Sequence, residues 1–404
     1  MSTTAHLATT VALAGFAIAF VTGAVAQRTN FCTMGAVSDV VNMGSWGRMR
    51  MWLLAVAVAI AGAAGLHAAG LIDLTKSIYV RANLPWLSLL VGGFTFGVGM
   101  TLGSGCGNKT LVRIGGGSLK SVVVLAFLAI SAYMTLKGLF GVWRVTFLDP
   151  VTVDLASFGL AGQDLPSMAA KALGMDKRTA LIAVAGVACV AILAFVAADR
   201  HFRTDFDHWL GGLAIGAMVV AGWYVTGHVG FAENPDTLEN TFFGTNSRTI
   251  ESLSFIAPAA YLLEILLLWS DKSLGITFGI ALALGVIAGS AAYSLATRSF
   301  RWEGFASAED TASHVIGGIL MGFGGVTAMG CTIGQGITGL STLAVGSVLA
   351  TVAIVAGSWA TMRWQLWRPP KKEVVISPLR SGENIRRFAL IISGYNSECL
   401  AHWP

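Results

Sequence analysis

Long apolar runs, without alternation of apolar and polar residues, dominate the chain. Leu7–Gln27, Thr179–Ala198 and Ser273–Thr297 carry no charged side chain, and each reaches the roughly 20 residues that a helix needs to cross a bilayer. Val315–Met362 is also uncharged and is long enough for two crossings. Further spans are expected near Met51–Ile72, Pro85–Leu102, Val122–Trp143, Trp209–Gly227 and Phe255–Ser270. A membrane barrel would need two-residue alternation, so the pattern predicts an all-α polytopic membrane protein with about nine transmembrane helices.

Composition and charge support this prediction and suggest a topology. Of the 404 residues, 55% are hydrophobic and only 12% are charged, against about 25% charged in soluble domains. No Lys or Arg precedes Arg28, whereas Arg363, Arg368, Lys371 and Lys372 follow the last span. By the positive-inside rule the N-terminus is then outside and the C-terminus cytoplasmic. The net charge of +5 is read as a topology signal for a protein of the lipid bilayer, and no nucleic-acid surface is expected.

Two glycine-rich segments repeat along the chain. Gly92–Cys106 ("GGFTFGVGMTLGSGC") aligns without a gap to Gly317–Cys331 ("GGILMGFGGVTAMGC"), with glycines and the final cysteine at matching positions. We therefore expect one transporter domain made of two homologous halves. The expected boundaries are 1–368 for the domain, about 1–145 and 178–368 for the halves, 146–177 for a polar connection and 369–404 for a polar C-terminal tail.

Both repeated segments break at Gly-Cys and continue as polar, glycine-rich chain. Irregular backbone at membrane depth is tolerated only inside protein or beside a wet cavity. Paired glycine-interrupted segments in two halves indicate a transport site at the repeat interface. The pattern predicts short re-entrant half-helices that meet near the midplane and whose exposed N–H groups can hold an anion.

Three cysteines occupy such breaks: Cys32, Cys106 and Cys331. Cys189 lies in an ordinary apolar run and Cys399 in the polar tail. No CxxC pair and no zinc-ligand spacing occurs, so we expect no disulfide framework, no metal site and no cofactor. Single thiols at successive breaks suggest one path lined by sulfur.

The chemistry of a lone thiol favours a sulfur-bearing anion as cargo. A neutral S–H is a weak donor, and burial in an apolar throat keeps it protonated. Arg28 and Lys109 flank two of the breaks and would attract an anion, or they serve as topology anchors. In the second repeat, uncharged Thr332 and Gln335 are candidate path-lining residues. Glu264 is the best candidate for a proton relay, and a weak one.

Two other classes of function remain open. A membrane thiol–disulfide oxidoreductase would need two cysteines close enough to bond. A soft-metal channel would use thiolates. The chain has no GxxxxGK[ST] motif for nucleotide binding, so facilitated uptake by a protein that is not an enzyme is favoured over ATP-driven transport.

The motifs "RTNFCTMGAVSD", "GSGCGNKTLVRIGGGS" and "GFGGVTAMGCTIGQGITGLS" resemble those of the YeeE/YedE family of bacterial inner-membrane proteins. The resemblance implies an hourglass-like fold with an inverted internal repeat and, as function, a permease for thiosulfate. It implies that Cys32, Cys106 and Cys331 bind the anion and relay it by S–H hydrogen bonds. It also implies a cytoplasmic TusA-like sulfur-carrier protein as partner. Another sulfur or selenium species remains an alternative cargo.

Overall fold

Most of the apolar runs form helices. The computed structural model describes residues 3–235, 237–271 and 274–367, and it is 72% helical with almost no sheet. Within these residues, eight helical segments are long and apolar enough to cross a membrane, which confirms an all-α polytopic membrane protein. Their main helices are α1 (Thr3–Thr29), α3 (Gly47–Ala68), α4 (Trp86–Leu102), α6 (Leu119–Lys137), α9 (Lys177–Ala197), α11 (Phe206–Tyr224), α13 (Phe278–Ala296) and α15 (Val345–Trp367).

Two further helices, α12 and α14, lie where spans were expected but are not among these eight segments. They account for the difference from the nine or so spans that the sequence predicts. α12 (Ile256–Leu267) forms where a span was expected, but its 12 residues reach only about 18 Å. α14 (Ala308–Thr327) has 20 residues, and Glu309 and Asp310 in its first turn lower its mean hydropathy.

Shorter elements connect and interrupt the long helices. Two antiparallel two-stranded sheets lie in loops, namely β1 (Asn83–Leu84) with β2 (Val153–Asp154), and β3 (Phe231–Glu233) with β4 (Asn240–Phe242). The short α-helices are α2 (Thr33–Ser38), α5 (Gly107–Gly115), α7 (Leu139–Phe147), α8 (Leu165–Leu173) and α10 (Arg200–Thr204). The π- and 3₁₀-helical turns are η1 (Asp39–Met43), η2 (Leu74–Lys76), η3 (Leu155–Phe158), η4 (Val225–Val229) and η5 (Gly334–Gly339).

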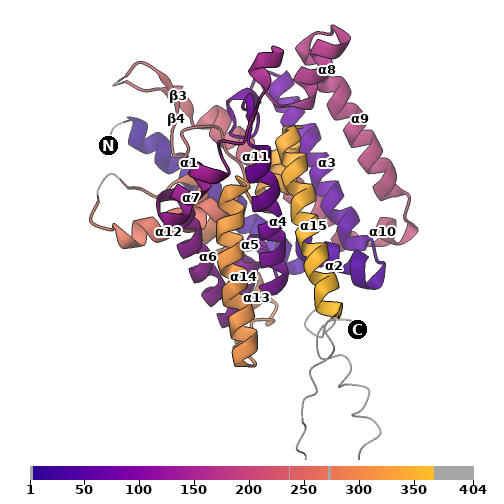
Figure 1. The fold of residues 1–404 in the computed structure, drawn as a ribbon, viewed down its shortest axis with the longest axis vertical. Coiled ribbons are helices and arrows are strands. Elements are labelled where there is room, and N and C mark those ends of the chain that lie inside the picture. Colours follow the sequence, from indigo (N-terminus) through magenta and orange to yellow (C-terminus); the bar gives the residue numbers. More distant parts are fainter. Residues whose placement is uncertain (1–2, 236, 272–273, 368–404) are drawn as a thin grey trace, which may run out of the picture. The chain divides into compact units, whose positions relative to one another are not determined.

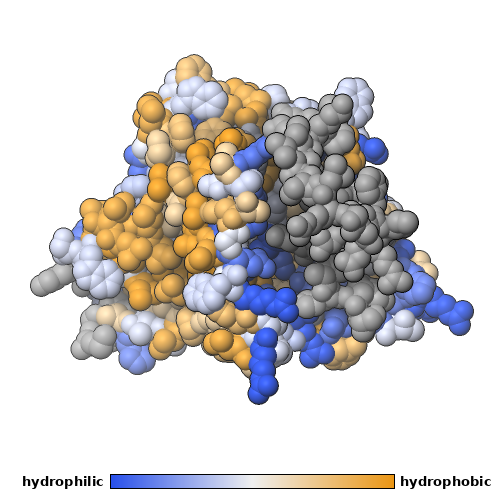
Figure 2. All heavy atoms as spheres, turned by 90° about the horizontal axis from the view of Figure 1, so that it is seen from below, coloured by the Kyte–Doolittle hydropathy of each residue, from blue (hydrophilic) through white to orange (hydrophobic). Residues whose placement is uncertain are grey.

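The outer faces of the long helices are apolar. Leu13 on α1 is 65% exposed and Val187 on α9 is 72% exposed. In the view from below, hydrophobic residues gather over one flank and hydrophilic residues lie toward the middle (Figure 2). Contiguous exposed apolar surface marks an interaction site, and on helices of this length the natural partner is lipid.

Glycines bring the two repeated segments, α4 and α14, into backbone contact. A Cβ at Gly92 would lie 2.5 Å from the amide nitrogen of Ala328, and a Cβ at Gly324 would lie 2.5 Å from the amide nitrogen of Phe96. Such distances exclude any side chain, so close approach of the two helices requires glycine at these positions. α14 lies beside both α4 and α6 (Figure 1).

The contacts of the two repeated segments are reciprocal. Gly93 of α4 faces the Ala350 carbonyl of α15, and its aligned counterpart, Gly318 of α14, faces the Val124 carbonyl of α6. The aligned glycines of the two repeated segments thus make corresponding contacts with neighbouring helices. The helices described here belong to one compact unit, Met1–Gln365. The tail expected at 369–404, and with it Cys399, lies outside the described residues.

Candidate transport path

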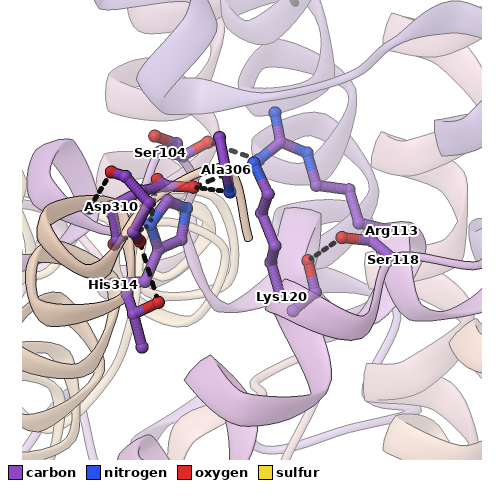
Figure 3. Close-up of polar contacts among 10 residues, drawn as sticks. Ser104, Arg113, Ser118, Lys120, Ala306, Asp310 and His314 are labelled. Carbon is purple, nitrogen blue, oxygen red and sulfur yellow. Dashed lines mark hydrogen bonds and ion pairs between the residues drawn. The ribbon is translucent and has the colours of Figure 1, made fainter. Parts of the chain in front are cut away.

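The first helix break follows α4. Gly103 ends the helix, Ser104 takes a left-handed backbone conformation (φ 55°), and Cys106 is the N-cap of α5. A helix end leaves carbonyl groups without intrahelical donors. Arg113 supplies a donor to one of these carbonyl groups: its Nη1 donates to the Ser104 carbonyl at 2.9 Å (Figure 3). The break is therefore held by the polar groups of α5.

The second break follows α14 and has the same form. Met329 takes the left-handed conformation (φ 58°), Cys331 follows two residues later, and the chain continues into η5. Gln335 Nε2 donates to the Ala328 carbonyl at 2.6 Å. The amide of Gln335 thus holds the helix end as Arg113 does in the first repeat, a role that sequence reasoning did not assign to it.

Two of the cysteines cap helical turns with their sulfur atoms. The Gly35 N–H donates to Cys32 Sγ at 3.3 Å, and the Gly334 N–H donates to Cys331 Sγ at 3.4 Å. An N-terminal turn presents unpaired N–H groups and a partial positive charge. Each sulfur therefore sits where an anion would also be stabilised.

The structure brings the thiols of Cys32 and Cys106 together and places Thr332 beside Cys106. The Cys106 thiol lies next to the Cys32 thiol and the Thr332 side chain, and Thr332 is the neighbour of Cys331 in the chain. Cys106 and Cys331 are fully buried, and Cys32 is 7% exposed. All three are free thiols, and Cys32, Cys106, Thr332 and Cys331 are called the row below.

Buried polar atoms without partners accompany this row. Among the described residues, Thr33 Oγ1, Asn108 Oδ1, Thr332 Oγ1 and Gln335 Oε1 are buried and have no hydrogen-bond partner. Each lies within four residues of one of the three cysteines. Unsatisfied buried polar atoms are rare in native proteins and call for water or a ligand. Sequence reasoning missed Thr33 and Asn108, although both stand beside a cysteine at a break.

The cations predicted beside the breaks differ in their placement. Arg28 forms an ion pair with Asp207 at 3.1 Å, and its guanidinium lies over the Phe206 ring. Lys109 Nζ donates to Asn30 Oδ1 at 3.2 Å, and the charges of Lys109 and Arg113 act on Cys32. Lys109 therefore belongs to the Cys32 end of the row, whereas Arg28 is engaged by α11.

A cavity of about 230 Å³ reaches the chain just before Cys331. Met329 and Gly330 form part of its wall, together with Tyr79 and Glu251. The Tyr79 hydroxyl is under the electrostatic influence of both Cys331 and Glu251. Nothing in the spacing of the sequence connects these loop residues with a cysteine, so sequence reasoning missed them. Within the described ranges, no group of three or more His, Cys, Asp or Glu side chains could hold a metal ion.

Glu264, the proton-relay candidate from the sequence, has a different environment. Its side chain is buried and forms an ion pair with Lys137 of α6. The pair joins α12 to α6 and is absent from the residues that line the cavity. A structural role for Glu264 is therefore favoured.

Apolar helices that break at buried thiols define a multi-pass membrane protein of the transporter class. A family model described as "Sulphur transport" matches residues 28–360, and the chain belongs to that family. Thiosulfate transporter TsuA of Escherichia coli (strain K12) is 26% identical over 369 residues, which cover 89% of this chain and 96% of that protein. Thiosulfate transporter TsuA of Spirochaeta thermophila (strain ATCC 700085 / DSM 6578 / Z-1203) is 25% identical over 358 residues, or 88% and 98% of the two chains.

Proposed function

We propose that this protein is an inner-membrane permease that takes up thiosulfate along the row Cys331, Thr332, Cys106, Cys32. The observation that carries the proposal is the burial of three thiols from distant segments, of which those of Cys32 and Cys106 lie together and that of Cys331 is next in the chain to Thr332, a neighbour of Cys106. Membership of the sulphur transport family and the names of the two relatives support thiosulfate as the cargo.

The row suits an anion that carries an exposed sulfur atom. A neutral thiol donates a weak hydrogen bond to a soft acceptor such as the terminal sulfur of thiosulfate. The helical turns that begin at Cys32 and Cys331 add N–H groups that favour negative charge. The anion would exchange one S–H donor for the next, with no covalent bond formed or broken and no proton transferred.

The two ends of the row fit the expected topology. The cavity beside Met329 would receive thiosulfate from outside, and Lys109 would stabilise the dianion beside Cys32 at the cytoplasmic end. A cation about 4 Å from an anion contributes about 1 kcal/mol where water screens the pair, and more where it is buried. A cytoplasmic TusA-like sulfur carrier would then consume the imported anion, as the resemblance to the family implies.

The test is uptake of radiolabelled thiosulfate into proteoliposomes. Cys106→Ala and Cys331→Ala should insert normally and take up little thiosulfate. Cys189→Ala is the matched control, because that thiol lies in α9 and donates to the Ala57 carbonyl at 3.4 Å. Loss of uptake in Cys189→Ala equal to that in Cys106→Ala would refute the assignment of the path.

The adjacent thiols of Cys32 and Cys106 also favour a second candidate, a thiol–disulfide oxidoreductase. Oxidation would join their sulfur atoms and pass two electrons to an oxidant such as a quinone, with release of two protons. A titration of free thiols after exposure to a soluble quinone separates the candidates. An oxidoreductase would lose two thiols per chain rapidly and reversibly, whereas a permease would keep all of them during thiosulfate uptake.

A further inference from the structure

The cavity beside Cys331 contains a carboxyl group that the row of thiols does not explain. Glu251 lies in the loop between β4 and α12 and lines the cavity with Tyr79 and Tyr261. Carboxylates are absent from the residues proposed to bind the anion, since a negative charge would oppose it. A carboxyl at the entrance therefore needs a role.

The backbone and the side chain of Glu251 are both fixed. Its N–H donates to Thr226 Oγ1 at 3.2 Å, and the Thr226 hydroxyl donates to its carbonyl. The N–H of Ser247 donates to Glu251 Oε1 at 3.0 Å, and the Ser247 hydroxyl donates to the same oxygen. Both side-chain hydrogen bonds reach Oε1, so Oε2 is the oxygen available to a proton or to a ligand in the cavity.

Arg144, the other charged residue that lines this cavity, and Lys137 on α6 each have a partner. Arg144 lines the wall and forms an ion pair with Asp149 at 3.1 Å. Lys137 is paired with Glu264 on the neighbouring helices. Among the described residues, Glu251 acts electrostatically on Tyr79 and Tyr261, and Cys331 acts on Tyr79. Each of these three groups is neutral in its ordinary protonation state near pH 7. The protonation of Glu251 is therefore the main variable charge at this entrance.

We propose that Glu251 is the specificity-determining charge gate of the entrance, which admits a dianion when the carboxyl is protonated and opposes it when the carboxyl is ionised. The protonated carboxyl donates a hydrogen bond to the anion, and the ionised one repels it in a cavity with apolar walls. Burial raises the pKa of Glu251, and the hydrogen bonds from Ser247 act in the opposite direction. The inference rests on the proposed thiosulfate uptake.

The test measures thiosulfate uptake into proteoliposomes from pH 5.5 to pH 8.5, with Glu251→Gln beside the wild type. Above the pKa of a single gating carboxyl, the protonated fraction falls about tenfold per pH unit, and wild-type uptake should fall with it. Glu251→Gln keeps an acceptor for Ser247 and a donor for the anion, so its uptake should stay high at pH 8.5. Glu239→Gln, just before β4, is the control, because that carboxylate is exposed at the surface and its loss should leave the wild-type profile unchanged.

A second variant tests the gate without removing the carboxyl. Ser247→Ala deletes the hydroxyl that stabilises the ionised form, so the midpoint of the profile should move to higher pH. An unshifted midpoint in Ser247→Ala, or a wild-type pH profile in Glu251→Gln, would overturn the gate while leaving the permease intact. A wild type that takes up no thiosulfate at any pH would instead overturn the proposed function.

Discussion

The two helix breaks share a backbone form but differ in what surrounds the cysteine. Cys106 has a second thiol, Cys32, and two cations, Lys109 and Arg113, in its neighbourhood. Cys331 has the backbone N–H of Phe255 beside it. Phe255 is the N-cap of α12 as Cys32 is the N-cap of α2. An N-cap residue with a phenyl ring thus stands beside Cys331, whereas an N-cap residue with a thiol stands beside Cys106.

In the proposed path, this difference would give the two ends distinct tasks. The Cys331 end has one thiol, an apolar cavity and a carboxyl, which suits selection of the anion. The Cys106 end has two thiols and positive charge, which suits retention of the anion before release. We propose that two breaks of the same backbone form supply a path with a direction, because the side chains around them differ.

Replacement of each thiol by a hydroxyl should have the largest effect and should separate the two ends. Serine keeps a donor but loses the polarizable sulfur that matches the soft terminal sulfur of thiosulfate, and a hydrogen bond to a charged group contributes about 1.5–3 kcal/mol. We expect Cys331→Ser to lower uptake at least about tenfold and Cys106→Ser to lower it less, since Cys32 remains beside it. The measurement is initial uptake in proteoliposomes, with Cys189→Ser as control. Equal losses of uptake in Cys331→Ser and Cys106→Ser would contradict the proposal that the two ends of the path have different roles.

Removal of the charge at Lys109 should have a smaller effect, and only at one end. Lys109→Gln should raise the half-saturating thiosulfate concentration roughly fivefold, as expected for the loss of about 1 kcal/mol. Salt should weaken wild-type binding more than binding by the variant. Arg203→Gln on α10 is the matched control, because it removes one exposed positive charge far from the described row. An identical salt dependence in wild type and Lys109→Gln would argue against a role for this cation.

The sequence predicted the features that depend on local pattern. Apolar runs located the long helices, and the alignment of Gly92–Cys106 with Gly317–Cys331 located both breaks and their thiols. The sequence could not predict which cations and carboxyl groups lie near the breaks and their thiols, because that placement depends on packing between distant segments. Glu251 reaches its place through Thr226, and Arg28 pairs with Asp207. Such contacts leave no periodicity in the chain.

Neutralisation of Arg28 should have the smallest effect of all. Arg28 and Asp207 are 44% and 49% exposed, and an exposed ion pair contributes about 0–1 kcal/mol to stability. Arg28→Gln should therefore leave thiosulfate uptake unchanged and lower the thermal stability of the protein in detergent slightly. Asp207→Asn should produce the same small loss, and the double variant should lose no more than either single one, because both changes remove one interaction. Reduced uptake in Arg28→Gln, with normal uptake in Asp207→Asn, would instead return Arg28 to the path beside Lys109.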